Sequence, residues 1–322
     1  MVDLITCGAI NWDISLFVDR FPKLGEEVPV REIKRVSGGT AANVAVAAAR
    51  ILGSNKVAFI GALGDDDIGK IQIRILEDEG VITSGIKIIN GVESGQAYIV
   101  IDAQGRNVIH TFFGANLRFG PEALMEEQIL RLIRESKVIV IMDPPLETAE
   151  KLAEIAHKDG ERIVIWDPGV YVEYGLEKLR ETLRNVDYFI LNHLEYEHLL
   201  GTSEPKKVGE KLSEINPNIV AIIKHGEKGS FLVKERGAEL HWLAAIPLEK
   251  LGLKVVNTVG CGDAFIGAFA SAKVLGFDDL EALKWANTAG AFKATKIETR
   301  GSPKKDELLD LLRKAEALGI WR

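Results

Sequence analysis

Six short, strongly apolar segments separated by longer helical patterns are the feature that most restricts how this chain folds. They read DLITCGAI (3–10), KVAFIGAL (56–63), KVIVIM (137–142), RIVIWD (162–167), YFILN (188–192) and IVAIIKHG (219–226). Continuous apolar runs of this length, rich in Val and Ile, are typical of strands that are buried on both faces. Their alternation with helical patterns predicts βαβ units, and so an α/β fold with a mostly parallel central sheet flanked by helices.

The helical patterns cover residues 40–52, 67–80, 146–160 and 194–201, and beyond residue 272 the chain is predicted to be helical to its end, over 278–296 and 304–319. A length of 322 residues suits one large α/β domain with an elaboration. We therefore expect residues 1–322 to form a single domain.

Two stretches interrupt this rhythm with alternating strand patterns. Residues 27–38 and 94–114 show it, and the second is a hairpin candidate with DAQG (102–105) as its turn. We expect them to pair into a small separate sheet, a β-flap formed mainly by about residues 12–37 and 92–116. Such a flap is predicted to act as a lid over one end of the main sheet.

Composition and charge argue against several classes of protein. A net charge of −7 argues against a nucleic-acid partner, which requires a basic surface. No apolar stretch approaches the ~20 residues of a membrane span, and the apolar start of the chain, interrupted by Asp3 and Asp13, reads as a first strand and not as a signal peptide. Cys7 and Cys261 lack the spacing of a metal site or disulfide framework, which favours the reducing cytoplasm.

The segment VVNTVGCGDAFIGAFASA (255–272) carries the clearest chemical signal. We expect a strand, KVVN, then a glycine turn, then a helix beginning near Ala264. Gly260 and Gly262 allow several backbone N–H groups to converge on one anion at the helix N-terminus, where the macrodipole adds positive potential. Asp263 is then either a helix cap or a general base that takes a proton from an attacking hydroxyl.

Two further segments carry groups suited to a sugar. In VSGGTAANVAVAAARILG (36–53), Gly38 and Gly39 allow a ligand to approach the backbone, and Asn43 either binds vicinal hydroxyls or points to solvent. In GAINWDI (8–14), Asn11 and Asp13 are placed at the end of the first strand, the edge at which open α/β sheets bind ligands. No dinucleotide G-x-G-x-x-G spacing and no P-loop is present.

Together these segments resemble the ribokinase family of carbohydrate and nucleoside kinases, also called the PfkB family. The resemblance spans nearly the whole chain, with GGTAAN (38–43), GALGDDDIG (61–69), LNHLEYEHLLG (191–201), KHGEKG (224–229) and NTVGCGDAFIGAF (257–269) in the family order. The segments HTFFGAN (110–116) and WDPG (166–169) are closest to those of archaeal nucleoside kinases.

The resemblance implies the following site residues. Asp263 matches the catalytic base, and the backbone of Gly260, Cys261 and Gly262 matches the anion hole. Acceptor contacts are implied at Asn11, Asp13, Gly39, Thr40, Asn43 and Asp143. Nucleotide contacts are implied at Asn192, Lys224, Gly226, Gly229 and Asn287, and Glu195 matches a residue that places Mg²⁺ through water.

Three positions depart from the family pattern. Asn257 replaces an aspartate that helps to build a monovalent-cation site, so any dependence on K⁺ is expected to be weak. Lys224 replaces the usual threonine of the nucleotide loop, and Thr40 replaces a lysine of ribokinases. Phe112, Phe113 and Trp12 either form an apolar pocket for a base or pack the flap against the core.

We therefore expect a kinase that transfers a phosphoryl group from a magnesium nucleotide to the primary hydroxyl of a ribose-containing acceptor. A nucleoside is the first candidate, and ribose or a sugar phosphate such as ribose 1-phosphate is the alternative. A non-catalytic sugar-binding regulator is a third possibility, which an intact Asp263 disfavours. ATP and ADP remain open as donors. By analogy with the family, a homodimer through the β-flap is also open.

Overall fold

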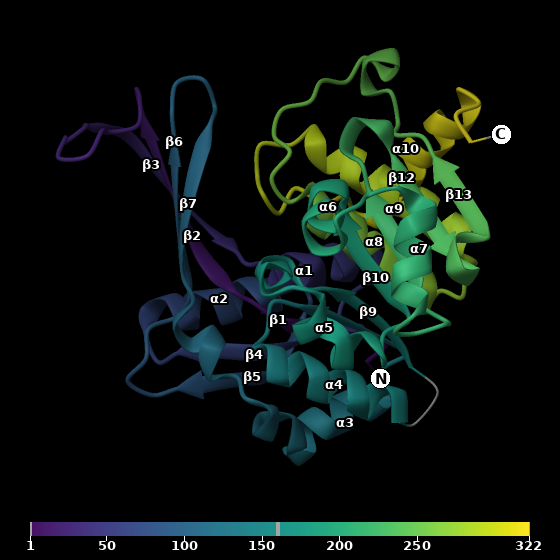
Figure 1. The fold of residues 1–322 in the computed structure, drawn as a ribbon. Coiled ribbons are helices and arrows are strands. Elements are labelled where there is room, and N and C mark those ends of the chain that lie inside the picture. The colour runs from purple at the N-terminus through teal and green to yellow at the C-terminus, as the bar shows by residue number, and fades with distance from the viewer. Residues whose placement is uncertain (1, 159–161, 322) are drawn as a thin grey trace.

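The computed structural model describes residues 2–158 and 162–321. Its centre is a nine-stranded sheet with the strand order β13-β12-β11-β10-β9-β8-β1-β4-β5 (Figure 1). The strands are β1 (Leu4–Gly8), β4 (Val57–Gly64), β5 (Ile82–Ile89), β8 (Val138–Met142), β9 (Ile163–Asp167), β10 (Tyr188–Asn192), β11 (Val220–Lys224), β12 (Ser230–Lys234) and β13 (Glu239–Leu243). All pairs from β5 to β11 are parallel, whereas β12 and β13 are antiparallel. The predicted mostly parallel sheet is confirmed, and the six predicted segments supply six of its strands.

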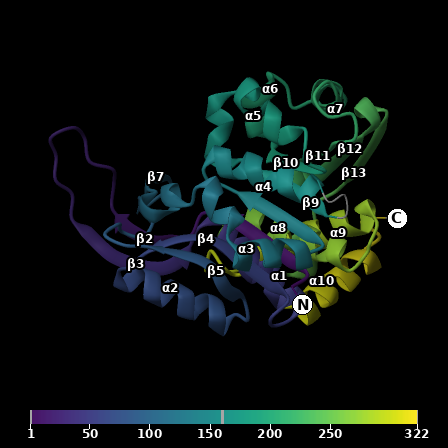
Figure 2. The ribbon, with the colours of Figure 1, turned by 90° about the horizontal axis from the view of Figure 1, so that it is seen from below.

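Helices cover both faces of this sheet. They are α1 (Thr40–Leu52), α2 (Asp67–Asp78), α3 (Glu127–Glu135), α4 (Leu146–Lys158), α5 (Leu176–Leu183), α6 (His193–Leu200), α7 (Pro205–Ser213), α8 (Cys261–Val274), α9 (Asp279–Ala294) and α10 (Lys305–Ala317). One core contains side chains of α1, α8, α9 and α10, and the other contains side chains of α3 to α7. Figure 2 shows α5, α6 and α7 on the side opposite α1, α9 and α10.

Close packing of α1 on α8 positions the site. Both helices are rich in alanine, and a Cβ at Gly267 would lie 2.6 Å from the Cβ of Ala47. Glycine at this position therefore permits an approach that no other residue would allow. The contact aligns the N-terminal turns of the two helices at the carboxyl edge of the sheet.

A second, four-stranded sheet projects from the body of the molecule (Figures 1 and 2). Its strands are β2 (Asn11–Val18), β3 (Val30–Gly38), β6 (Gln96–Ile101) and β7 (Asn107–Phe112), in the order β3-β2-β6-β7. β2 and β6 are parallel and the other pairs are antiparallel. The predicted DAQG turn closes the β6–β7 hairpin, with the Gly105 N–H donating to the Asp102 carbonyl at 2.9 Å. The small separate sheet is thus confirmed, and we call it the β-flap.

Several predicted boundaries are wrong. KVVN (254–257) is not a strand. The backbone N–H of Val256 donates to Ala294 O at 2.7 Å, so the segment supplies a hydrogen-bond donor to a carbonyl at the end of α9. α8 begins at Cys261 and not near Ala264. Asn11 and Asp13 belong to β2, because β1 already ends at Gly8.

The C-terminal part of the chain is also not helical throughout. α9 ends at Ala294 and α10 starts at Lys305, so a loop of irregular structure separates them. The predicted helix over 146–160 is α4, and its residues 159–160 lie outside the described residues. Across residues 2–158 and 162–321, none of the helices combines the length and the apolar character that crossing a bilayer requires.

Candidate active site

Four adjacent strands of the main sheet have a polar residue at, or directly after, their carboxyl ends. Asp143 follows β8, and Asp167, Asn192 and Lys224 are the last residues of β9, β10 and β11. Parallel strands present these ends along one edge, where open α/β sheets bind their ligands. The N-terminal turns of α1 and α8 face the same edge, so the predicted acceptor and anion-binding residues converge there.

The first turn of α8 forms an anion cradle. Gly260 is its N-cap with φ of 84°, and a Cβ there would collide with the carbonyl oxygen of Thr299. The Cys261 N–H donates to Thr258 O at 3.2 Å. Within the described part of the chain, the amides of Gly262 and Asp263 donate to no backbone carbonyl. These two amides, with the positive end of the helix dipole, are available to an anion.

Asp263 lies in this first turn and is not the helix cap. Its Oδ2 accepts a hydrogen bond from Asn43 Nδ2 at 2.8 Å. Burial, together with the nearby Asp167 charge, raises the pKa of Asp263 to about 6, although Asn43, Lys224 and Arg300 act in the opposite direction. Its carboxylate is therefore ionised at neutral pH and is more basic than an exposed aspartate.

Asn43 is held in one orientation from its other side. Arg300 Nε donates to Asn43 Oδ1 at 2.7 Å, and its NH2 group donates to the Gly38 carbonyl at 2.9 Å. Because Arg300 can only donate, Asn43 must turn its amide NH₂ group towards Asp263. Arg300 NH1 is buried and lacks a hydrogen-bond partner within the described residues. Burial also lowers the pKa of Arg300 to about 10.

Asp13 lies beside this group. Its carboxylate packs against Gly38, where any side chain would collide with it. Burial raises the pKa of Asp13 to about 7, although Arg300 lowers it in part. Asn11, predicted to contact the acceptor, accepts through Oδ1 from Asn116 Nδ2 at 2.9 Å. Its side chain thus anchors the base of the flap.

Asp143 forms the opposite wall. It accepts from Thr40 Oγ1 at 2.8 Å and from the Val170 N–H at 3.1 Å. Burial, and then the charge of Asp167, raises the pKa of Asp143 to about 7. The structure brings Thr40, at the start of α1 behind the Gly39 N-cap, into the same cluster as Asp143.

A largely buried ion pair joins the carboxyl ends of β9 and β11. Lys224 Nζ and Asp167 Oδ2 are 2.8 Å apart, and a Cβ on Gly262 would lie 3.5 Å from the same Nζ. Although burial opposes its charge, Asp167 and Glu195 raise the pKa of Lys224. This ammonium is therefore charged beside the α8 cradle, where a transferred phosphoryl group would collect negative charge.

Asn192 and Glu195 form a capping box at the start of α6. Asn192 Oδ1 accepts from the Glu195 N–H at 2.9 Å, and Glu195 Oε2 accepts from the Asn192 N–H at 2.7 Å. Burial, and then repulsion by Asp167, raises the pKa of Glu195. The half-buried Glu195 and the buried Asp167 lie at one edge of the sheet. They suit a hydrated Mg²⁺ bound mainly through phosphates, since Mg²⁺ takes one or two carboxylates and keeps several waters. A dedicated protein cage of three or more metal-ligating side chains is absent among residues 2–158 and 162–321.

The predicted nucleotide loop connects β11 and β12. Gly226 has φ of 55° and Gly229 has φ of 96°, which glycine adopts readily. Asn287 of α9 accepts from Ser230 Oγ at 3.1 Å, so Asn287 supports the loop from the face that carries α8. His193 and His225 stack with centroids 4.0 Å apart, a contact that their sequence positions do not reveal.

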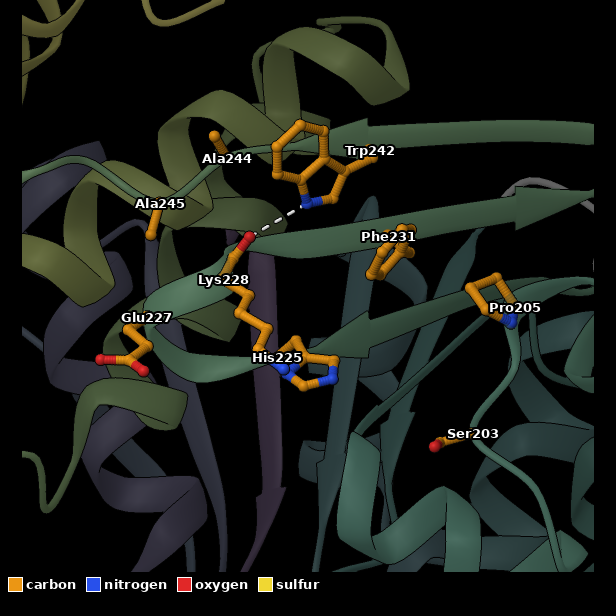
Figure 3. A pocket seen from close by; sticks show the side chains of 9 residues that line it. All are labelled: Ser203, Pro205, His225, Glu227, Lys228, Phe231, Trp242, Ala244 and Ala245. Atoms are coloured by element: carbon orange, nitrogen blue, oxygen red, sulfur yellow. Dashed lines mark hydrogen bonds between the residues drawn. The ribbon is translucent and has the colours of Figure 1, made fainter.

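A cavity of about 450 Å³ borders the same loop on the other face of the sheet (Figure 3). It is lined by Ser203, Pro205, His225, Glu227, Lys228, Phe231, Trp242, Ala244 and Ala245. Phe231 and Trp242 pair across β12 and β13, and they point away from Ser230 and Asn287. This cavity is therefore not part of the Asp263 cluster.

Phe112 and Trp12 do not lie on the face of the β-flap that carries Asp13. Phe112 pairs with Gln96 and Gln96 pairs with Trp12, so these three share one face of the β-flap. Asp13 is in the next row and points to the opposite face, because side chains alternate along a strand. The pleat of the flap thus turns Phe112 and Trp12 away from Asp13, and a base pocket formed by Phe112, Phe113 and Trp12 stays a prediction.

Sequence reasoning missed three residues of this site. Asp167 was recognised only as part of WDPG. Arg300 stands in the loop between α9 and α10, parts of which were predicted to be helical. Lys293 looks like any other polar position of α9. Arg300 and Lys293 carry no local motif. Only their burial beside Asn43 and Asn257 distinguishes them.

The site and fold define a phosphotransferase with a hydroxyl acceptor. The sequence matches the pfkB family carbohydrate kinases over residues 1–306, and the chain belongs to this family. It is 31% identical to the ATP-dependent ribose-1-phosphate kinase of Halopiger xanaduensis, with 97% of this chain and 98% of the relative covered. It is 28% identical to the ribokinase of Haemophilus influenzae, over 97% and 99% of the two chains.

Solved structures agree with this assignment. Arabidopsis thaliana ribokinase complexed with ribose and ATP superposes with a TM-score of 0.87 at 27% identity, covering 97% of this chain and 99% of that one. The nucleoside kinase of Methanocaldococcus jannaschii superposes with a TM-score of 0.81 at 20% identity, covering 98% and 99%, and so shares the fold.

Proposed function

We propose that this chain transfers the γ-phosphoryl group of Mg-ATP to the primary hydroxyl of a phosphorylated pentose, with ribose 1-phosphate as the first candidate. The observation that supports the kinase chemistry most directly is the half-buried Asp263, hydrogen-bonded to Asn43, beside the free amides of α8. Asp263 takes the hydroxyl proton as the hydroxyl oxygen attacks the γ-phosphorus. ADP then leaves, and the amides of Gly262 and Asp263 together with Lys224 balance the charge of the transferred group.

The donor nucleotide is proposed to lie along the β11–β12 loop, with its phosphates directed at α8. Gly226 and Gly229 let the loop backbone approach the nucleotide, and Asn287 fixes the loop through Ser230. Mg²⁺ would be held by the phosphates and, through water, by Glu195, where it screens the donor charge. Asn192 caps α6 and so positions Glu195.

A phosphorylated acceptor is favoured by Arg300. This guanidinium lies next to Asp13 and Asn43, and its NH1 group is buried and without a partner in the described residues. A buried unpaired donor costs ~1–3 kcal/mol, and an anionic oxygen would satisfy it. The similarity to a ribose-1-phosphate kinase supports the same acceptor.

A nucleoside remains the second candidate because exposed apolar side chains lie on the same face of the β-flap as Asp13. Val36 pairs with Asp13. Ile109 stands two residues from Thr111, which lies in the same row as Asp13, so its side chain is on the same face. Both Val36 and Ile109 are exposed. An exposed apolar patch beside the acceptor residues would suit a base. Asp13 and Asn43 are proposed to bind the ribose diol with either acceptor.

A panel of acceptors tests the proposal. We would measure kcat/KM with ATP for ribose 1-phosphate, ribose, a nucleoside and 2-deoxyribose 1-phosphate. The proposal requires ribose 1-phosphate to react best. Loss of the 2-hydroxyl should cost ~10–150-fold, because a buried polar partner stays unpaired. Preferred turnover of the nucleoside would transfer the assignment to the second candidate.

We also propose that a second copy of the chain covers the outer face of the β-flap. That face carries the exposed side chains of Ile33, Tyr98, Val108 and Phe112, which the register places together. Apolar sheet faces of this kind are typical of interfaces. The chain is proposed to work in the cytoplasm, where Cys7 and Cys261 stay free thiols.

A further inference from the structure

Lys293 is unusual among the basic residues of this protein. Its side chain is 0% exposed, and within residues 2–158 and 162–321 it is the one Lys or Arg that is fully buried. Long basic side chains are almost never buried without a partner of opposite charge. The described residues offer Lys293 no carboxylate within ion-pair distance, however. The position therefore calls for another explanation.

Backbone carbonyl groups take the place of a carboxylate. Lys293 Nζ donates to Asn257 O at 2.9 Å and approaches Lys296 O at 3.5 Å. The side chain of Asn257 reinforces this arrangement, since its Nδ2 donates to Ile297 O at 2.7 Å and its Oδ1 accepts from the Val259 N–H at 3.0 Å. Carbonyl oxygens that converge on one point replace the hydration shell of a monovalent cation in ion-selective sites. Here two such carbonyls, those of Asn257 and Lys296, face an ammonium group from two different loops.

The ammonium lies directly behind the anion cradle. Asn257 and Val259 belong to the segment that enters α8, and the Cys261 thiol also approaches Asn257 O at 3.9 Å. On the other side, the carbonyl of Lys296 belongs to the loop that carries Arg300 and that contacts Gly260 through Thr299. One cation thus connects the loop before the general base with the loop that orients Asn43.

We propose that Lys293 is a built-in monovalent cation, which positions the α8 cradle and makes the phosphoryl transfer independent of free K⁺. Its positive charge adds to the potential of the helix N-terminus at which the transferred group is stabilised. Burial lowers the pKa of Lys293, and Cys261, Glu298 and Asp263 partly offset this effect. The inference rests on the proposed kinase activity and concerns a positioning residue, since Lys293 touches neither substrate.

Two matched variants separate this role from simple packing. Lys293→Ala removes the ammonium and leaves space for an ion, whereas Lys293→Met removes the charge but fills much of the same volume. Initial rates are measured at constant ionic strength in choline, Na⁺, K⁺ and NH₄⁺ chloride. We expect the wild type to vary less than about twofold. Lys293→Ala should lose activity in choline and regain at least about tenfold in K⁺ or NH₄⁺, which corresponds to about 1.4 kcal/mol. Lys293→Met should stay low in every salt.

A measurement without substrate keeps the test independent of the acceptor. The unfolding temperature of Lys293→Ala should rise with K⁺ concentration, while those of the wild type and Lys293→Met should not, because a ligand stabilises only the state that binds it. If the proposed acceptor is wrong, the wild type gives no turnover but the temperature shift persists. A wild type strongly activated by K⁺, or a Lys293→Ala variant that shows neither rescue nor a temperature shift, would overturn the inference.

Discussion

The amide nitrogen of Asn43 lies 2.8 Å from the carboxylate of Asp263, although the two residues are 220 positions apart in the chain. The contact exists because α1 and α8 pack closely enough to align their first turns. It stabilises the ionised form of the carboxylate and places it beside the predicted acceptor residues. Arg300 completes the arrangement by fixing the Asn43 amide. Each of these contacts leads to a measurable consequence.

Asp263→Asn should abolish most of the turnover while leaving substrate binding intact. The amide keeps the shape of the side chain and a hydrogen bond with Asn43 after rotation, but it cannot accept the proton. We expect kcat to fall ~10²–10⁴-fold with little change in KM. Unchanged thermal unfolding and unchanged ATP binding serve as controls. A variant that retains more than about a tenth of the wild-type kcat would exclude Asp263 as the base.

The pH profile should report the ionisation of Asp263. Because the ionised form is the base, kcat/KM should decline as the pH falls through about 6 and level off above it. Asn43→Ala removes a hydrogen bond that lowers the pKa of Asp263, so the acidic limb should move to higher pH. The two profiles are compared under saturating ATP. A limb at the same pH in both proteins would contradict the role of Asn43.

Asp143 should make stability depend on pH. Its folded-state pKa of about 7 lies above its ordinary value of 3.8, mainly because of burial. The folded protein then holds this proton more tightly than the unfolded chain does, so the stability due to Asp143 declines as pH rises from about 4 to 7. Asp143→Asn should therefore gain unfolding temperature relative to the wild type at pH 8 and not at pH 4. An equal difference at both values would argue against this ionisation.

Arg300→Met should change selectivity between acceptors. Losing a charged donor to an anionic oxygen costs ~1.5–3 kcal/mol, or roughly 10–150-fold in kcat/KM for ribose 1-phosphate. Free ribose should lose less, because only the orientation of Asn43 is affected. Arg300→Lys, which keeps the charge, is the matched control and should retain part of the preference. Equal losses with both acceptors would limit Arg300 to a structural role.

Val108→Glu should convert the proposed dimer into a monomer. Val108 is exposed on the outer face of the β-flap, and a charge buried without a partner in an apolar interface is strongly unfavourable. The neighbouring Asn107 points to the other face, so Asn107→Glu is the matched control. Light scattering of both variants and the wild type gives the masses. A wild type that is monomeric at micromolar concentration would remove the basis of this proposal.

Local patterns in the sequence were sufficient for the architecture and for the catalytic motif. The Val- and Ile-rich runs reflect burial on both faces of a strand, which is a local property, and so they predicted six strands of the parallel sheet. The flap hairpin was predicted from its turn residues in the same way. Gly260 and Asp263 were identified because an anion cradle is built from one continuous segment.

Only the tertiary structure decided which distant side chains share the site and which do not. The pleat of the flap turned the side chain of Phe112 to the face that does not carry Asp13, although both residues stand in segments that the sequence linked to the acceptor. Arg300 and Lys293 became significant through burial and through partners far away in the chain. Periodicity records whether a residue is buried, but not which residues surround it. That depends on how α1, α8 and α9 pack together, and no local segment contains this information.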